Sequence, residues 1–222
     1  KGLKNICKSP LKKWSNIEYK SKIVEKYGRV FSNKENGSLK KYSPKINSFI
    51  EILNKSEGII IIYSQFIGGG CIPIGLALEE AGYDNYLTNN LFKKRPIKEK
   101  KGKYMMITGD KKLTPKKDLI KALTICNSKE NAKGEKIKVI IISKAGSEGI
   151  DFKNIRQIHI LEPWYNLNRI GQIEGRGVRN LSHCFLPFKE RNVMVFLHCL
   201  HTNNKSHESI DFYIYRHAEQ KD

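Results

Sequence analysis

Short apolar runs alternate with longer amphipathic segments along this chain. Five runs are rich in β-branched or aromatic residues and too short for lone helices, which is typical of buried parallel strands. These runs are 58–66, 104–110, 139–142, 158–161 and 193–200. Helical patterns lie between them, at 44–57, from Pro73 onward, at 118–126 and at 166–180. The alternation predicts an α/β domain with a mostly parallel central sheet.

The helix expected from residue 44 has signals at both ends. Ser43 is a suitable capping residue, and Pro44 suits the first helical position. Gly58 marks the end of the segment, where the first core strand begins. The apolar side chains share one helical face, at Ile46, Phe49, Ile50 and Leu53.

A small, polar turn follows the apolar run 139–142. Its sequence is SKAGSEGID, and Gly146 and Gly149 allow backbone amides to come close to a ligand. The next apolar run, 158–161, stops shortly before Pro163. Two strands that end beside such turns are typical of a ligand site in an α/β domain.

Two arginines lie near the end of the helical pattern 166–180. Arg176 and Arg179 are three positions apart, so on a helix they would share one face. A guanidinium group is planar and permanently charged, and it binds phosphate in a bidentate manner. With the preceding strands converging on the same edge, the pattern predicts a phosphate-transfer site.

Positive charge dominates the composition. The 222 residues include 41 Lys plus Arg and 22 Asp plus Glu, a formal net charge of +19. Such an excess implies an acidic partner, with nucleic acid as the first candidate, although lysines also serve simply to keep a surface soluble. The basic loop 93–103 leaves the same choice between a nucleic-acid contact and a solvated insertion. For the lysine-rich residues 1–40 we expect a basic linker or the remnant of an insertion, with a short helix around 17–27.

The cysteines and histidines favour neither a disulfide framework nor a metal site. Five cysteines without a CxxC spacing suggest reduced thiols in a cytosolic protein. His183 with Cys184, and His198 with Cys199, match no structural zinc spacing, so we expect no metal. No run reaches transmembrane length, and the start lacks the apolar core of a signal peptide. We therefore expect a soluble, cytoplasmic protein without a membrane partner.

A glycine-rich turn follows the first strand. Gly68, Gly69 and Gly70 lie where a strand enters a helix, the usual place of a dinucleotide or methyl-donor loop. The GxGxxG fingerprint with its acidic residue one strand later is not cleanly met, and glycine-rich turns are common at such junctions. A cofactor loop is therefore an alternative without a full motif behind it.

Two motifs within residues 139–180 resemble those of a known family. GSEGID followed by QIEGRGVR resembles motifs V and VI of superfamily 2 helicases. The neighbouring sequences HILEPWYNLNRIGQ and RNLSHCFLPFKERNV are similar to those of the helicase-like NTPases of large nucleocytoplasmic DNA viruses. That group includes the poxvirus early-transcription ATPases and mimivirus-type and asfarvirus-type relatives. The resemblance extends from about Lys41 to the end of the chain.

The resemblance implies a three-layer RecA-like domain, with a mostly parallel central sheet and helices on both faces. Residues 41–222 would form the C-terminal RecA-like domain of a two-domain motor. The last residues resemble the start of the family's next helical segment, so we expect a domain that is truncated at its C-terminal end. The first domain's phosphate loop, GxxxxGKS or GxxxxGKT, and its DExx run do not occur in this sequence. The chain is therefore expected to be inactive alone.

By the same resemblance, the whole protein would be an ATP-dependent helicase or translocase that serves viral transcription or DNA remodelling. Its cofactors would be ATP and Mg²⁺, with Mg²⁺ held mainly by the missing N-terminal RecA-like domain of the same protein. Its partners would be nucleic acid, with DNA favoured over RNA, and the viral transcription machinery, in the host cytoplasm or the virion. The alternative is a degenerate RecA-like module that binds nucleic acid or proteins without ATPase activity.

In motif VI, the resemblance assigns catalytic roles to three residues. Arg179 matches the arginine finger, and Arg176 matches its partner on the γ-phosphate. Gln172 heads the motif and would form a hydrogen bond near the γ-phosphate or the attacking water. Together they would stabilise the negative charge that develops during phosphoryl transfer.

In motif V, the resemblance assigns residues that bind ATP. Gly149 would offer backbone approach, and Asp151 matches the residue that contacts the ribose or relays to motif VI. Glu148 belongs to the same expected nucleotide site. A purely structural alternative is that the two arginines only form salt bridges with these acidic residues or with Glu174.

Motif VI departs from the family pattern QxxGRxxR at three positions. The family usually has apolar or small residues where Glu174 and Gly177 stand, and an acidic residue at Gly171. Each extra glycine inside a helix costs roughly 1 kcal/mol relative to alanine. A carboxylate at Glu174 would weaken phosphate binding if it faced the cleft.

Backbone contacts with nucleic acid are implied at three turns, and such contacts position a strand without reading its sequence. The first turn lies at motif IV, the second in the sequence ITGD and the third at the start of motif V. Their expected contact residues are Ser64 and Gln65, then Thr108 and Gly109, then Ser143, Ala145 and Gly146.

Overall fold

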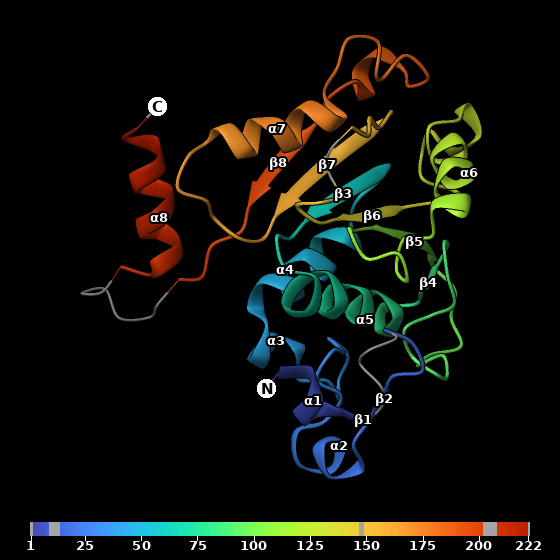
Figure 1. Cartoon of the computed structure of the whole chain (residues 1–222), viewed down its shortest axis with the longest axis vertical. Helices are drawn as coiled ribbons and strands as arrows, with labels where there is room; N and C mark the ends of the chain where they lie inside the picture. Colours follow the sequence, from blue (N-terminus) through green and yellow to red (C-terminus); the bar gives the residue numbers. More distant parts are fainter. Residues whose placement is uncertain (1, 9–13, 147–148, 202–207, 222) are drawn as a thin grey trace.

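A single parallel sheet forms the centre of the molecule (Figure 1). The computed structural model describes residues 2–8, 14–146, 149–201 and 208–221. Within them, six strands follow the order β4-β5-β6-β3-β7-β8, and every neighbouring pair is parallel. The strands are β3 (Ile59–Tyr63), β4 (Tyr83–Asn85), β5 (Gly102–Ile107), β6 (Val139–Ile142), β7 (Ile155–Ile160) and β8 (Met194–Leu197). The predicted α/β architecture with a parallel sheet is confirmed, and β4 is an additional short strand.

Helices cover both faces of this sheet. One apolar core joins the sheet to α4 (Pro44–Leu53) and α5 (Ile72–Ala81), and a second joins it to α6 (Lys116–Cys126) and α7 (Asn168–Gly177). Successive residues of a strand point to opposite faces. Accordingly, Ile60 and Ile62 belong to the first core, whereas Ile59 and Ile61 belong to the second. The domain therefore has the expected three layers.

The remaining elements are short and lie around these layers. A two-stranded antiparallel pair joins β1 and β2. The C-terminal helix α8 lies beyond the end of β8, apart from the other helices (Figure 1). The bounds are α1 (Gly2–Ile6), β1 (Cys7–Lys8), β2 (Glu18–Tyr19), α2 (Ser21–Tyr27), α3 (Leu39–Tyr42), a π-helix η1 (Ile67–Cys71), the 3₁₀ turns η2 (Lys129–Asn131) and η3 (Phe188–Glu190), and α8 (Ile210–Glu219).

Helix α4 begins at Pro44 as the sequence predicts, but Ser43 does not cap it through its side chain. Ser43 is also the residue that ends α3, and its backbone amide donates to the carbonyl oxygen of Leu39. One residue thus closes one helix and opens the next, and its backbone conformation is set by the first of these tasks.

The N-terminal forty residues, for which we expected a basic linker, contribute to the first core. Ile17, Phe31 and Leu39 are buried in it. Arg29 forms an ion pair of 2.8 Å with the buried Glu80 of α5. Described residues of this segment therefore pack against the domain through apolar and ionic contacts.

Helix α7 is shorter than the pattern 166–180 suggested. It ends at Gly177, and Val178 is extended, with φ −112° and ψ 91°. A Cβ at Gly177 would lie 3.1 Å from side-chain atoms of Ile155, so the helix end is close-packed against the start of β7. Arg179 therefore lies beyond the helix, and the expectation that it shares a helical face with Arg176 was wrong.

Candidate functional site

Two arginines from the end of α7 converge on one carboxylate. Nη1 of Arg179 lies 2.7 Å from Oδ2 of Asp151, and Nη1 of Arg176 lies 3.8 Å from Oδ1 of the same residue. The Nε of Arg179 donates to the carbonyl oxygen of Gly175 at 2.8 Å, which fixes the direction of its side chain. About half of the Arg179 side chain is exposed. Two permanent cations around one anionic group form a position that suits a phosphate.

The backbone around Asp151 is held from two sides. The amide of Phe152 donates to the carbonyl oxygen of Arg176 at 2.8 Å, which joins motif V to the end of α7. Asn127, directly after α6, donates from Nδ2 to the carbonyl oxygen of Asp151 and accepts from the amide of Lys153. Asn127 was not expected from the sequence, because only the fold brings the end of α6 beside this loop.

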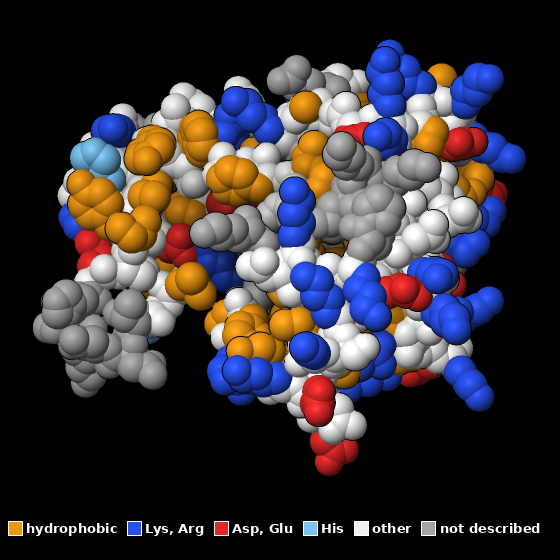
Figure 2. Space-filling view, turned by 60° about the horizontal axis from the view of Figure 1, so that its bottom comes forward, with side chains coloured by type: hydrophobic (Ala, Val, Ile, Leu, Met, Phe, Trp, Pro, Cys, Tyr) orange, Lys and Arg blue, Asp and Glu red, His pale blue; other side chains and the backbone are white. Residues whose placement is uncertain are grey.

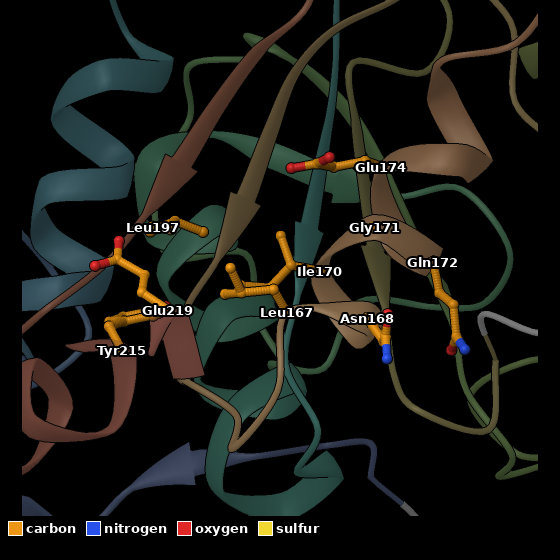
Figure 3. A pocket seen from close by; sticks show the side chains of 9 residues that line it. All are labelled: Leu167, Asn168, Ile170, Gly171, Gln172, Glu174, Leu197, Tyr215 and Glu219. Carbon is orange, nitrogen blue, oxygen red and sulfur yellow. The ribbon is translucent and has the colours of Figure 1, made fainter. Parts of the chain in front are cut away.

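Gln172 and Glu174 lie on different sides of α7. Gln172 is four residues before Arg176 and so shares its side of the helix. Glu174 is four residues after Ile170, whose side chain is buried in the second core. Figure 3 shows the Glu174 carboxylate and the Gln172 amide pointing in different directions from the helix. The Glu174 carboxylate, which would weaken phosphate binding if it faced the cleft, therefore points away from the side of α7 that carries Arg176.

A groove of about 730 Å³ lies beside this helix (Figure 3). Gly171 and Glu174, two of the three departures from the family pattern, both line it. A Cβ at Gly171 would meet no atom within 4 Å, so this glycine leaves open space. The full lining comprises Leu167, Asn168, Ile170, Gly171, Gln172, Glu174, Leu197, Tyr215 and Glu219.

The second and third expected nucleic-acid turns are in contact with each other at the carboxyl ends of β5 and β6. The amide of Ser143 donates to the carbonyl oxygen of Ile107 at 3.0 Å. A Cβ at Gly146 would lie 2.0 Å from that same oxygen, so no side chain fits there. A Cβ at Gly109 would lie 3.0 Å from the Cβ of Ala145. Both Gly109 and Ala145 are exposed, and at Gly109 the exposed surface is backbone because glycine has no side chain.

The hydroxyl groups in these turns are buried and engaged within the protein. Ser143 Oγ accepts from the amide of Gly146 at 3.2 Å. Thr108 Oγ1 accepts from the amide of Asp110 and lies 3.3 Å from Thr114 Oγ1. The structure thus places these side chains as supports of the turns, and leaves Gly109 and Ala145 as exposed residues of the two turns.

The motif IV turn lies next to these two turns and is held by an acidic residue that the sequence did not reveal. The amide of Ser64 donates to the carbonyl oxygen of Ile142 at 3.1 Å. The buried hydroxyl of Ser64 donates to Glu162 Oε1 at 2.8 Å. The backbone amide of the half-buried Gln65 donates to Glu162 Oε2 at 3.2 Å. Burial raises the pKa of Glu162, against the opposing effect of these hydrogen bonds. Glu162 follows β7, so it joins the turns after two neighbouring strands.

The two groups of residues lie at opposite ends of the sheet. The turns follow the carboxyl ends of β3, β5 and β6, whereas the end of α7 packs against Ile155 at the amino end of β7. Our expectation that strand ends and arginines meet at one edge was therefore wrong, because α7 runs back along the sheet. Ser143 lies at the end of the sheet with the turns, and Asp151 lies at the end with the arginines. Gly149 within them has φ +73°, and Glu148 lies outside the described residues.

Within the residues that the structure describes, neither a cluster of metal-ligating side chains nor a membrane-spanning helix occurs. Among them, no three His, Cys, Asp or Glu residues are grouped so that they could hold a metal ion. No helix in this described part of the chain is both long and apolar enough to cross a membrane. His198 contacts His159 inside the first core, at 2.9 Å between ring nitrogens, and this burial lowers the pKa of His159 to about 3.

Comparison with known families identifies the domain to which most of this chain belongs. The model of the family described as "Helicase conserved C-terminal domain" matches residues 44–180, more than half of the chain. These residues include all three turns, Asp151 and both arginines. The resemblance to superfamily 2 helicases is thus confirmed.

The relatives include proteins of large DNA viruses. The "Termination factor NPH-I homolog" of African swine fever virus (isolate Tick/Malawi/Lil 20-1/1983) is 33% identical over 195 residues, which cover 76% of this chain and 27% of the relative. A protein of Acanthamoeba polyphaga mimivirus whose name describes an ATP-dependent RNA helicase is 30% identical, over 83% of this chain and 31% of the relative. A killer plasmid pGKL-2 helicase of Kluyveromyces lactis is 32% identical, over 86% of this chain and 30% of the relative. The chain thus spans less than a third of the length of these relatives.

Among solved structures, the C-terminal part of the Fun30 ATPase domain has the same fold. The TM-score is 0.53 at 18% identity, and the match covers 84% of this chain and 47% of that one. At this identity the likeness supports the RecA-like fold and nothing further.

Proposed function

This chain belongs to the family of helicase conserved C-terminal domains, and we propose that it is the second motor domain of an ATP-dependent nucleic-acid helicase or translocase. In this proposal it completes an ATP site that it shares with an N-terminal RecA-like domain. The observation that carries the proposal is the convergence of Arg176 and Arg179 on the Asp151 carboxylate. An anion already occupies the place between the two guanidinium groups, so a phosphate is the ligand that they suit.

In the proposed mechanism, Arg179 acts as the arginine finger and Arg176 as its partner. Arg179 is half exposed and held by one ion pair, so it can exchange the carboxylate for the γ-phosphate. Gln172 lies on the Arg176 side of α7, where its amide would reach the γ-phosphate or the water that attacks it. Mg²⁺-bound ATP supplies the phosphoryl group that is transferred, and preorganised cations stabilise the charge that develops on it. The groups that hold Mg²⁺ belong, in this proposal, mainly to the N-terminal domain.

The other end of the sheet binds the nucleic-acid backbone in this proposal. The exposed Gly109 and Ala145 and the side chain of Gln65 would contact phosphates, which gives affinity without reading a sequence. The net charge of +19 supports an acidic partner. Figure 2 shows Lys and Arg side chains spread over much of one face of the molecule, with fewer acidic ones.

Residues 143–154 connect the two ends. A strand held at the exposed Ala145 and a nucleotide held near Asp151 would act on the same stretch of sequence, which offers a physical link between ATP hydrolysis and movement. We take DNA as the track, and RNA as the alternative to be compared with it. The African swine fever virus relative is named a termination factor homolog. In this proposal the protein partner is the viral transcription machinery, in the host cytoplasm or the virion.

The first experiment measures ATP hydrolysis, with and without nucleic acid, by the protein that carries both motor domains. We expect Arg179→Ala to lower kcat by about 10³-fold or more with ATP binding intact, because that is the usual effect of an arginine finger. Arg216→Ala is a matched control, since Arg216 on α8 is as exposed as Arg179 and has an ion pair of 2.8 Å. This control should stay within about twofold of the parent.

Either of two results would overturn part of the proposal. An Arg179→Ala variant as active as the parent would make the arginine cluster structural. A folded parent without any ATP turnover would favour the degenerate RecA-like module, which binds nucleic acid or proteins only.

A further inference from the structure

The glycine-rich turn after β3 has no role in the function proposed above. Residues 67–71, with the sequence IGGGC, form the π-helix η1 between Phe66 and α5. π-helical turns are rare and frequently occur at functional sites. The cofactor motif considered for this turn is not met, so its unusual backbone calls for another explanation.

Phe66 has a fixed backbone and an exposed ring. Its amide donates to Ser64 Oγ at 3.3 Å, and its carbonyl oxygen accepts from the amide of Cys71 at 2.9 Å. The side chain is nevertheless 54% exposed. A single exposed aromatic residue is normal on a protein surface, so the argument depends on what surrounds the ring.

Bare backbone lies beside the ring. A Cβ at Gly69 would meet only the Cβ of Phe66, at 3.8 Å, and a Cβ at Gly68 would meet only the indole of Trp14, at 3.4 Å. Neither glycine has φ in the left-handed region, so the backbone conformation does not demand glycine at these two positions. What glycine provides here is backbone free of side chains next to the exposed Phe66 and the half-buried Trp14.

The indole of Trp14 is also fixed in place. Its Nε1 donates to Oδ2 of Asp110 at 2.8 Å, although Trp14 and Asp110 are far apart in sequence. Asp110 belongs to the turn of Thr108 and Gly109, one of those assigned above to phosphate contacts. The two rings and the glycines therefore lie beside the proposed track of the nucleic-acid backbone.

We propose that the ring of Phe66, the indole of Trp14 and the backbone of Gly68 and Gly69 form a platform on which bases of a single-stranded nucleic acid stack. This platform rests on the proposed function, and it specifies a single strand as the form of nucleic acid that is bound. Aromatic rings accept every base, because each base has a π-face. In a duplex those faces are already stacked on neighbouring bases, so the platform discriminates against it.

The test compares strands with and without bases. Fluorescence anisotropy would measure the affinity of the 222-residue chain for a labelled thymidine oligonucleotide and for an abasic oligonucleotide of equal length. We expect the parent to bind the thymidine strand about 10-fold more tightly, which is within the usual effect of stacking. Phe66→Ala should remove most of that difference, and Phe66→Tyr should keep it. Gly69→Leu should also remove it, because its side chain would cover the platform.

Two further measurements make the result specific. Phe188→Ala removes a ring that is 88% exposed in the loop after motif VI, and it should leave both affinities unchanged. The thymidine strand should quench tryptophan fluorescence in the parent, and Trp14→Phe should abolish most of the quenching. Urea unfolding of each variant would show that it remains folded.

Three outcomes would overturn the platform. Equal, salt-dependent affinity of the parent for both strands would indicate backbone contacts alone, so the proposed function would stand without the platform. A Phe66→Ala variant that keeps the preference for bases would place the stacking elsewhere. Failure of the parent to bind either strand at low salt would also remove the proposed nucleic-acid role.

Discussion

Oδ2 of Asp151 lies 2.7 Å from Nη1 of Arg179, and this contact joins the end of motif V to the end of motif VI. Both side chains are about half exposed. An exposed ion pair contributes only about 0–1 kcal/mol to stability. The value of the contact therefore lies in positioning, since it keeps Arg179, the proposed arginine finger, next to Arg176.

Asp151→Asn should weaken catalysis without weakening the fold. The amide keeps the size of the side chain but loses the charge that orients both guanidinium groups, so we expect kcat to fall about 10-fold, within the effect of small misplacements. Steady-state kinetics of the two-domain protein would measure this. Asp84→Asn is the control, because Asp84 pairs with Arg95 at 3.1 Å, in an ion pair that shares no residue with the candidate site. A higher kcat for Asp151→Asn would instead show that the carboxylate competes with the phosphate.

Glu174→Gln should leave ATP hydrolysis within about twofold of the parent, the range of surface substitutions. The reason is that Glu174 lies on the side of α7 that carries the buried Ile170 and not on the side that carries Arg176. Gln172→Ala, on the arginine side, should lower kcat by about 10-fold or more. A marked gain for Glu174→Gln would mean that its carboxylate does repel the nucleotide.

Gly146→Ala and Gly171→Ala should have opposite effects on stability. A methyl group at Gly146 would collide with backbone atoms of Ile107, so the turn must move, and we expect a loss of about 1–3 kcal/mol. A methyl group at Gly171 meets open space within a helix, where alanine gains up to about 1 kcal/mol over glycine. Chemical denaturation of the two variants would measure both values. Similar stabilities would contradict the close contact between the turns after β5 and β6.

Leu39→Ala should destabilise the chain by about 2–5 kcal/mol, the range for emptying a buried leucine site. Leu39 is 1% exposed and contributes to the first core. Ile120→Ala, at a position that is 73% exposed on α6, should change stability by less than about 0.5 kcal/mol. Urea unfolding would compare the two. An unaffected Leu39→Ala variant would indicate that the N-terminal segment is a linker after all.

The buried histidine pair should make stability fall in acid. Burial lowers the pKa of His198 to about 4 and that of His159 to about 3. Between these values and about 6.5, the unfolded chain binds more protons than the folded one, so stability is present above this range and is lost as the pH falls through it. One such histidine lowers the free energy of unfolding by about 2 kcal/mol when the pH falls from 7 to 5.

His198→Gln should therefore reduce the acid sensitivity by about that amount, relative to the parent. The comparison with the parent is necessary because Glu79, whose pKa burial raises to about 7, acts in the opposite direction. Urea unfolding at pH 7 and pH 5 would measure the effect, with His217→Gln on α8 as the control. An unchanged pH dependence in His198→Gln would contradict the lowered pKa.

The sequence by itself determined five of the six strands of the described sheet, the layers and the family. Apolar runs such as 139–142 are local features, and their burial on both faces follows from composition alone. The motifs GSEGID and QIEGRGVR are also local, because a phosphate site needs particular residues at short spacings. These features could be identified without coordinates.

Only the tertiary structure decided which residues meet. Asn127, Glu162 and Trp14 each contact a site residue far away in the sequence, and no local pattern indicates such a contact. The end of α7 depends on close packing of Gly177 against Ile155. The spacing of Arg176 and Arg179 alone therefore could not show that Arg179 lies beyond the helix. The separation of the turns from the arginines has the same origin, because the direction in which α7 runs back along the sheet is set by packing between layers.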